Sequence, residues 1–178
     1  MANKIRLATV WLDGCSGCHM SLLDMDERLI DLVGKVDVVY TPIMDIKKYP
    51  EDVDVAVVEG AINSEEDYER ILEIRKNTKL LVALGDCAIT ANVPAMRNPF
   101  GTEATLKRAY LENVTLQPQI PHGEVPPLLL RARPVHAIVK VDLFVPGCPP
   151  SADTIHYVLT ELLEGRTPDP TTRSRFGA

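Results

Sequence analysis

Short apolar runs alternate with helical segments along this chain, and this alternation constrains its fold more than any other feature. The runs are apolar at nearly every position, which is typical of strands buried on both faces of a parallel sheet. They predict strands over residues 5–12, 36–40, 53–58 and 79–84, with another inside 135–145. Helical spacing predicts helices over residues 20–33, 64–76, about 102–111 and 152–164, with Gly34 and Gly165 as stops. The order predicts an α/β fold, with an open, mostly parallel sheet and helices on both faces.

The bulk composition limits the functions open to the chain. Its 178 residues suit one domain over 1–178. A formal net charge of −6 argues against a nucleic-acid surface, which needs clustered Lys and Arg. No apolar run approaches the roughly 20 residues of a membrane span. Residues 1–6 lack the regions of a secretory signal, so we expect a cytoplasmic protein with reduced thiols.

Two stretches fall outside the regular pattern. Residues 91–134 hold seven of the fourteen prolines, which disfavours long regular elements, and residues 166–178 form a polar, loop-like tail. Each is either plain loop or a docking surface, because long irregular segments in compact domains are often functional.

The four cysteines each follow a predicted strand. Cys15 and Cys18 come after the first strand, Cys87 after the fourth and Cys148 after the last. In a parallel sheet these connections emerge at the carboxyl edge, where such folds bind ligands. We therefore expect the cysteines to converge at that edge, with Cys15, Cys87 and Cys148 in loops.

Four converging thiolates suit a cubane iron–sulfur cluster, in which a Cys-x-x-Cys pair holds adjacent corners. Gly14, Gly17, Gly85 and Gly147 flank the cysteines. Glycine permits tight turns and lets backbone N–H groups approach the cluster sulfides, which offsets the cluster's negative charge. The sequence thus predicts one [4Fe–4S] cluster on Cys15, Cys18, Cys87 and Cys148.

Three alternatives to a cluster remain open for these cysteines. Cys15 and Cys18 could form a thioredoxin-like dithiol, although Cys87 and Cys148 then have no role. A structural zinc ion could use the same four thiolates. The cysteines could also be unrelated buried thiols, although their shared Gly- and Pro-rich surroundings argue against this.

Four motifs, in the same order, resemble the small subunits of [NiFe] hydrogenases. They are residues 11–21 (WLDGCSGCHMS), 57–62 (VVEGAI), 85–88 (GDCA) and 146–150 (PGCPP). The resemblance spans nearly the whole chain and implies a flavodoxin-like domain whose four matching cysteines bind the proximal [4Fe–4S] cluster. The chain is shorter than the membrane-linked type and lacks its C-terminal Cys and His ligands. It is therefore most similar to the short small subunit of cytoplasmic NAD-reducing hydrogenases.

This resemblance implies partners and a reaction. A large subunit would hold the nickel–iron centre, and a diaphorase with further Fe–S clusters and FMN would reduce NAD. No fingerprint for binding NAD occurs in this chain, and no acid–base chemistry is required of it. The related quinone-reductase subunit of respiratory complex I typically has adjacent cysteines in the first motif, whereas Cys15 and Cys18 are separated. An iron–sulfur subunit of a related quinone or ferredoxin oxidoreductase remains the alternative function.

A few other residues are candidates near the cluster. Glu59 ends a buried strand at the same edge. The resemblance implies contact with the cysteine loops or the large subunit, and the alternative is a solvated acid at the end of a strand. His19 adjoins Cys18 and either lies near the cluster or simply starts a helix. Trp11 is expected in the core or at a subunit interface. His122, His136 and His156 show no ligand spacing.

Overall fold

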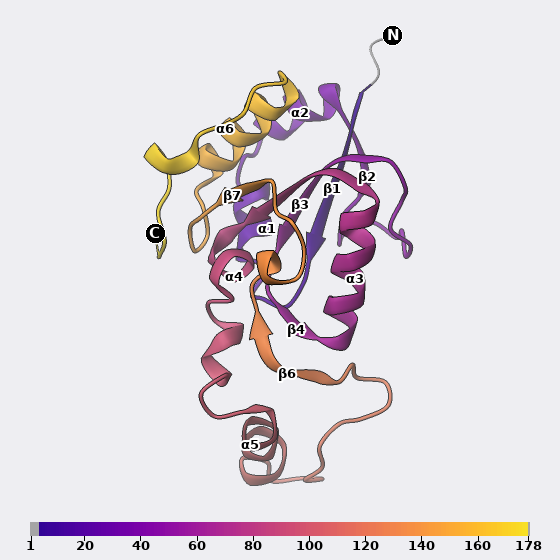
Figure 1. Cartoon of the computed structure of the whole chain (residues 1–178), viewed down its shortest axis with the longest axis vertical. Coiled ribbons are helices and arrows are strands. Elements are labelled where there is room, and N and C mark those ends of the chain that lie inside the picture. The colour runs from indigo at the N-terminus through magenta and orange to yellow at the C-terminus, as the bar shows by residue number, and fades with distance from the viewer. Residues whose placement is uncertain (1–3, 178) are drawn as a thin grey trace.

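The computed structural model describes residues 4–177, so residues 1–3 of the N-terminal segment and Ala178 of the tail lie outside the described part. Five parallel strands form the main sheet (Figure 1). The strands are β1 (Ile5–Trp11), β2 (Val36–Tyr40), β3 (Val53–Glu59), β5 (Thr78–Leu84) and β7 (Leu143–Val145). Their order across the sheet is β2-β1-β3-β5-β7. The predicted α/β fold with a mostly parallel sheet is confirmed.

Helices cover both faces of this sheet, because its strands are apolar on both sides. Ala56 and Val58 of β3 pack with α3 (Glu65–Lys76) and α4 (Gly85–Thr90). Val55 and Val57 face the other way, against α2 (Arg28–Lys35) and α6 (Ala152–Leu163). The short helix α1 (Gly17–Leu23) lies on this second face through Cys18 and Leu22. Ser64 caps α3 through a reciprocal capping box with Asp67.

The single helix predicted over residues 20–33 is wrong. The structure divides it into α1 and α2, with a turn between them. Asp26 takes a left-handed conformation (φ 51°), which ends the helical hydrogen-bond pattern and lets Met25 become buried. Gly34 does not stop a helix either, because α2 continues through it to Lys35.

The strand predicted inside 135–145 occupies only its last three residues, as β7. Residues Val135–Ala137 form a 3₁₀ turn instead. Val135 and Val139 are apolar because they are buried in the core on the α3 side of the sheet, and not because they pair with a strand.

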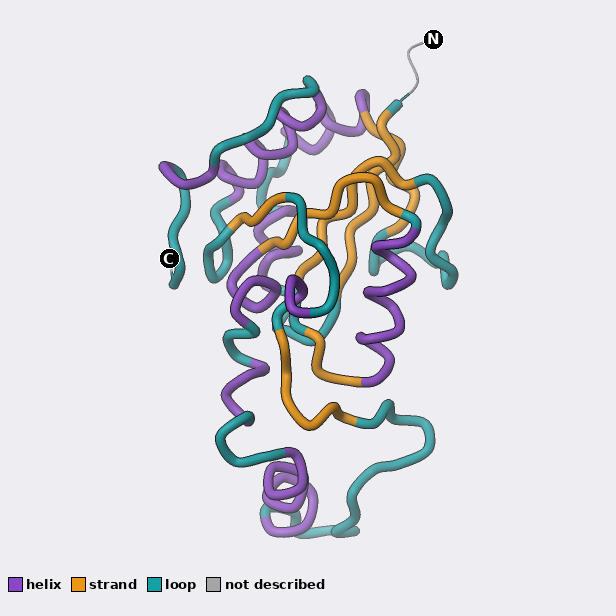
Figure 2. Tube along the Cα trace, viewed as in Figure 1, coloured by secondary structure: helices purple, strands orange, loops and turns teal. Residues whose placement is uncertain are grey.

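Residues 91–134, called here the projecting segment, are more regular than their prolines suggest. They contain a 3₁₀ turn (Pro94–Arg97), α5 (Thr102–Lys107) continued by a π turn (Arg108–Glu112), and β6 (Leu128–Arg133). Strand β6 pairs antiparallel with β4 (Ile62–Ser64), forming a second sheet that the sequence did not predict. Figure 2 shows this segment extending away from the main sheet.

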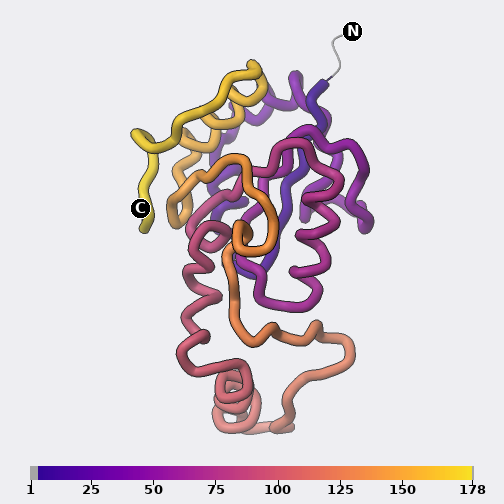
Figure 3. The backbone as a smooth tube through the Cα atoms, viewed as in Figure 1, coloured from indigo at the N-terminus to yellow at the C-terminus, as the bar shows by residue number. Residues whose placement is uncertain are grey.

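The C-terminal tail, residues 166–177, is mostly loop, with one 3₁₀ turn at Pro170–Thr172. It leaves the end of α6 and descends beside the chain that carries β7 (Figure 3). Within residues 4–177, no helix has both the length and the apolar character needed to cross a membrane.

Candidate functional site

Four neighbouring strands of the main sheet end level with one another. Trp11, the last residue of β1, is in register with Glu59 of β3, Glu59 with Leu84 of β5, and Leu84 with Val145 of β7. The connections that follow β1, β5 and β7 therefore start side by side at the carboxyl edge. These three connections carry all four cysteines.

The structure brings the cysteines together much as the sequence predicts, with one correction. Cys15 and Cys148 are exposed in loops, and Cys18 is half-buried in the first turn of α1. Cys87 was expected in a loop but lies buried in the first turn of α4. The reason is that β5 passes into α4 at Gly85 with no loop between them.

The thiols are near enough to influence each other's ionisation. Burial raises the pKa of Cys18, and the charge of Glu59, a hydrogen bond with Glu59, and the neighbouring Cys87 and Cys15 raise it further. Burial also raises the pKa of Cys87, to which Cys15 and Cys148 add; a hydrogen bond from the Val93 N–H acts in the opposite direction. Each of these two thiols therefore lies close enough to two other cysteines for their charges to raise its pKa.

Glu59 lies against Cys18, at the end of β3, and is only 2% exposed. Its Oε2 accepts a hydrogen bond of 2.9 Å from the His19 N–H. The His19 Nδ1 lies 3.2 Å from Glu59 Oε1, but this contact lacks hydrogen-bond geometry, so both atoms are buried without a hydrogen-bond partner. The sequence prediction that Glu59 contacts the cysteine loops is consistent with this position.

Glycines make room at the site. Gly85 has a φ of +81°, and a Cβ there would lie 2.3 Å from Cys18 Sγ. A Cβ on Gly147 would lie 2.6 Å from the Pro150 backbone, and one on Gly14 would lie 3.3 Å from Gly60 Cα. The Gly17 N–H donates to Cys15 Sγ at 3.4 Å. Three of these glycines thus allow close packing, and Gly17 supplies a donor to a sulfur.

Two residues of the site are not predictable from the motifs alone. The Asn92 side-chain amide lies 3.5 Å from Cys148 Sγ as a donor, and nothing local in the sequence predicts that contact. Asp86 is 5% exposed, and its Oδ1 accepts the Gly147 N–H at 2.8 Å. An acid directly before Cys87, separated by one residue from the end of a buried strand and inside the motif of residues 85–88, was a signal for a residue of this kind.

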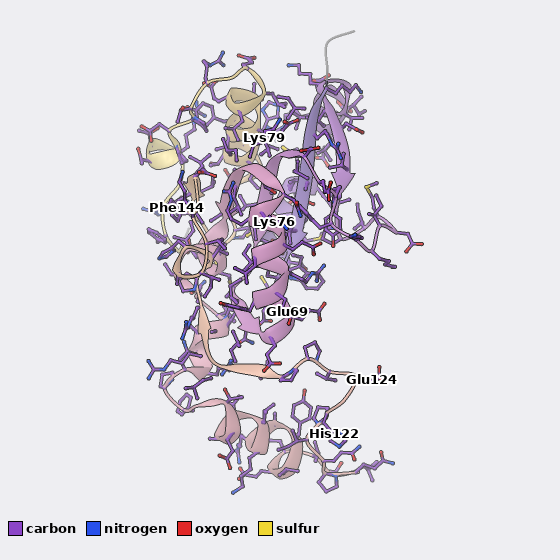
Figure 4. The ribbon with its side chains drawn as sticks, turned by 45° about the vertical axis from the view of Figure 1, so that its right-hand side comes forward. Glu69, Lys76, Lys79, His122, Glu124 and Phe144 are labelled. Carbon is purple, nitrogen blue, oxygen red and sulfur yellow. The ribbon has the colours of Figure 1, made fainter. Side chains whose placement is uncertain are left out.

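Other candidates lie outside the group. His122 and Glu124 are on the loop of the projecting segment, well below the main sheet in Figure 4. His136 packs edge-on against Phe144, with ring centroids 5.8 Å apart. Trp11 is 45% exposed, so the expectation that it lies in the core is wrong, while its place at a subunit interface stays a prediction.

The donor set fits an iron–sulfur cluster. It consists of four free thiols on three connections, with backbone N–H groups directed at two of the sulfurs. A zinc ion would need its sulfurs about 2.3 Å from one point, and in the part of the chain described here no three His, Cys, Asp or Glu side chains are grouped to hold a single ion. In a cubane each thiolate binds a different iron, so the four cysteine sulfurs must lie farther apart than around a single zinc ion.

Comparison with known proteins decides the family. The model of the NADH ubiquinone oxidoreductase 20 kDa subunit matches residues 15–162, which include all four cysteines. The chain belongs to this family. Within the 20 kDa subunit family, it is 41% identical to the NAD-reducing hydrogenase HoxS subunit delta of Cupriavidus necator, over 98% of this chain and 86% of that protein.

Other members of the family agree. One subunit of the F420-non-reducing hydrogenase of Methanothermobacter marburgensis is 37% identical over 93% of this chain, which spans only 55% of that protein. A solved structure of an NAD+-reducing [NiFe]-hydrogenase in the H2-reduced state superposes with a TM-score of 0.93 and 40% identity, covering 98% of this chain and 99% of the matched one. The predicted kinship with small subunits of NAD-reducing [NiFe] hydrogenases is confirmed, and the chain is an oxidoreductase subunit.

Proposed function

We propose that this chain relays electrons within a cytoplasmic NAD-reducing [NiFe] hydrogenase, through one [4Fe–4S] cluster held by Cys15, Cys18, Cys87 and Cys148. The observation that carries the proposal is the convergence of all four thiols at the carboxyl ends of β1, β5 and β7. When bound, such a cluster supplies a one-electron carrier. The proposed unit is one iron–sulfur-binding domain over residues 1–178.

The chain's own residues would hold this group and adjust its charge. The N–H groups of Gly17 and Val93 donate to the Cys15 and Cys87 sulfurs, which stabilises thiolates. Asn92 offers a further donor to Cys148. Burial of Cys87 keeps water from one side of the site, while Cys15 and Cys148 remain exposed on the side where a partner would exchange electrons.

The proposed partners are a large subunit with the nickel–iron centre and a diaphorase with further Fe–S clusters and FMN. Support comes from the NAD-reducing hydrogenases among the relatives. This chain matches one chain of a solved NAD+-reducing [NiFe]-hydrogenase over almost the full length of both chains. The projecting segment and the tail are the candidate partner surfaces. The family model is named for a quinone reductase, so the separated Cys15 and Cys18 are what favours the hydrogenase over that alternative.

The thioredoxin-like alternative agrees less well with the site. A reactive dithiol depends on a thiolate of lowered pKa, whereas burial raises the pKa of both Cys18 and Cys87. Metal-bound thiols are deprotonated by the metal itself, so a raised pKa of these free thiols does not oppose cluster binding.

The test is iron and sulfide analysis of the anaerobically purified full-length chain. We expect about four irons and four sulfides per chain, and a single cluster by electron paramagnetic resonance. Cys148→Ser and Cys87→Ser should lose most of this iron, because a serine oxygen is a poorer ligand for cluster iron. Met20→Ala, a change at an exposed neighbour, should keep it. An iron-free wild-type chain, or one with two interacting clusters, would refute the proposal.

A further inference from the structure

Asp86 is a buried carboxylate that joins three separate parts of the chain. It is the second residue of α4 and directly precedes Cys87. Its Oδ1 accepts the Gly147 N–H at 2.8 Å, and its Oδ2 accepts the Gly177 N–H at 2.7 Å. Its own N–H donates to the Gly147 carbonyl at 2.9 Å. Among the ion pairs of residues 4–177, none involves Asp86, and the hydrogen bonds that its side chain accepts come from backbone N–H groups.

The second of these contacts anchors the end of the tail. The tail is also fixed along its length, since the Thr154 hydroxyl donates to the Arg173 carbonyl at 3.0 Å and the Arg173 guanidinium lies 4.1 Å from the centre of the Tyr157 ring. The Ser174 hydroxyl donates to the carbonyl of Pro146, in the loop that carries Cys148. The tail therefore runs from α6 across the Cys148 loop and ends on Asp86.

These contacts determine the position of Cys148, one of the two exposed cysteines. Cys148 is exposed and belongs to no helix or strand. The N–H and the carbonyl of the preceding residue, Gly147, are both bonded to Asp86, so the peptide planes on both sides of Gly147 are fixed relative to α4 and Cys87. Hydrogen bonds to a charged acceptor are about twice as strong as neutral ones.

We infer that Asp86 is a positioning residue that fixes the Cys148 loop against α4. The hydrogen bonds between Asp86 and Gly147 are called here the clamp, and the C-terminal tail, called the strap, adds to it through the bond from Gly177. The inference rests on the proposed function in taking Cys148 as a cluster ligand. A loosened clamp would let Cys148 leave its iron more often, so the cluster would become easier to lose without any ligand being changed.

The test compares Asp86→Asn with a chain truncated after Arg173, both otherwise full length. The amide keeps the size of the side chain but replaces one acceptor with a donor that faces an N–H. Hydrogen exchange should speed up about tenfold or more at Gly147 and at residues 174–177 in Asp86→Asn, since each lost bond is to a charged group. Iron release to a chelator should also be several-fold faster, and the electron paramagnetic resonance line broader, in both variants.

Asp153→Asn is the matched control, because its side chain is 83% exposed on the first turn of α6 and the charge change is the same. It should match the wild type in both measurements. Unchanged exchange at Gly147 together with unchanged iron release in Asp86→Asn would overturn the inference. If that variant fails to fold, iron release from the truncated chain decides, and a wild-type rate there overturns the strap. A wild-type chain without iron would refute the proposed function instead. The hydrogen-exchange rates at Gly147 and at residues 174–177 would still test whether Asp86 fixes the Cys148 loop.

Discussion

The site depends on the absence of a Cβ atom at Gly85. It joins β5 directly to α4 and has a φ of +81°, a conformation that costs other residues about 1–2 kcal/mol. A Cβ at this position would lie 2.3 Å from Cys18 Sγ, so a larger residue would push that sulfur away. The same residue thus sets the backbone that places Cys87 and leaves the space that Cys18 occupies.

Gly85→Ala should therefore destabilise the chain and reduce its iron content. We expect a loss of unfolding free energy above about 2 kcal/mol, from the strained φ and the clash together. The matched control is Gly101→Ala, which has a φ of +83° but no atom within 4 Å of the added carbon. That control should lose about 1 kcal/mol and keep its iron. Urea unfolding of the two variants measures the difference, and equal losses would contradict the clash.

At the scale of elements, the position of the three-residue strand β7 depends on Asp142, the acid that directly precedes it. The Asp142 N–H donates to the Leu81 carbonyl, and Asp142 Oδ2 accepts the Leu81 N–H at 2.9 Å and the Arg75 guanidinium at 2.6 Å. These contacts connect the start of β7 to β5 and to the end of α3. Because Cys148 follows β7, its loop starts from this fixed point.

Asp142→Asn should cost stability at neutral pH and much less in acid. Burial by itself would raise the pKa of Asp142, but the Leu81 N–H and the Arg75 guanidinium hold it below its usual value. A lowered pKa in the folded state contributes stability above the ordinary pKa of an aspartate, and this is lost as pH falls through the folded-state value. We expect a loss of about 1–3 kcal/mol at pH 7.

Urea unfolding at neutral pH and at a pH below the ordinary aspartate value measures this effect. The gap between wild type and variant should narrow in acid, where the wild-type carboxyl becomes protonated. Asp153→Asn serves as the control, with a loss below about 1 kcal/mol because its ion pair with Arg28 is largely exposed. A gap that is the same at both pH values would show that the charge of Asp142 contributes nothing.

On the scale of the whole molecule, the projecting segment is a firmly attached platform with an apolar surface. Arg97 attaches it to the second sheet, donating to the Asn63 side chain at 2.9 Å and to the Leu129 carbonyl at 2.7 Å. Its five most exposed large apolar side chains are Val93 (51%), Met96 (70%), Phe100 (74%), Leu116 (82%) and Leu130 (78%). The segment begins beside Cys87 and Cys148, which Val93 and Asn92 contact.

Phe100→Asp should therefore weaken assembly with the proposed large subunit, because a charge would be buried where an apolar contact is expected. Ile30→Asp is the control, on α2 and equally exposed at 74%. Co-purification of each variant with the large subunit, followed by size-exclusion chromatography, makes the comparison. We expect at least a tenfold loss of complex for Phe100→Asp and none for Ile30→Asp. Equal recovery of both complexes would exclude this surface as the contact.

The sequence by itself determined the main sheet and the grouping of the cysteines. Runs such as residues 53–58 are apolar on both faces, and that local pattern is enough to predict a covered parallel strand. Once the strands are parallel, the connections after them share one edge, so cysteines far apart in the chain had to meet there. The placement of Cys15, Cys18 and Cys148 follows from these two steps.

Only the tertiary structure decided the parts that rest on contacts between distant residues. Strand β4 exists because Ile62 and Ser64 pair with residues of β6, about 70 positions later in the chain. Its three residues are too few to show an alternating strand pattern in the sequence. The break between α1 and α2 occurs at the left-handed Asp26 and accompanies the burial of Met25, and the helical spacing of this stretch does not predict either. The contacts of Asp86 with Gly147 and Gly177 also leave no local pattern, because hydrogen bonds between residues 61 and 91 positions apart are set by the folded chain alone.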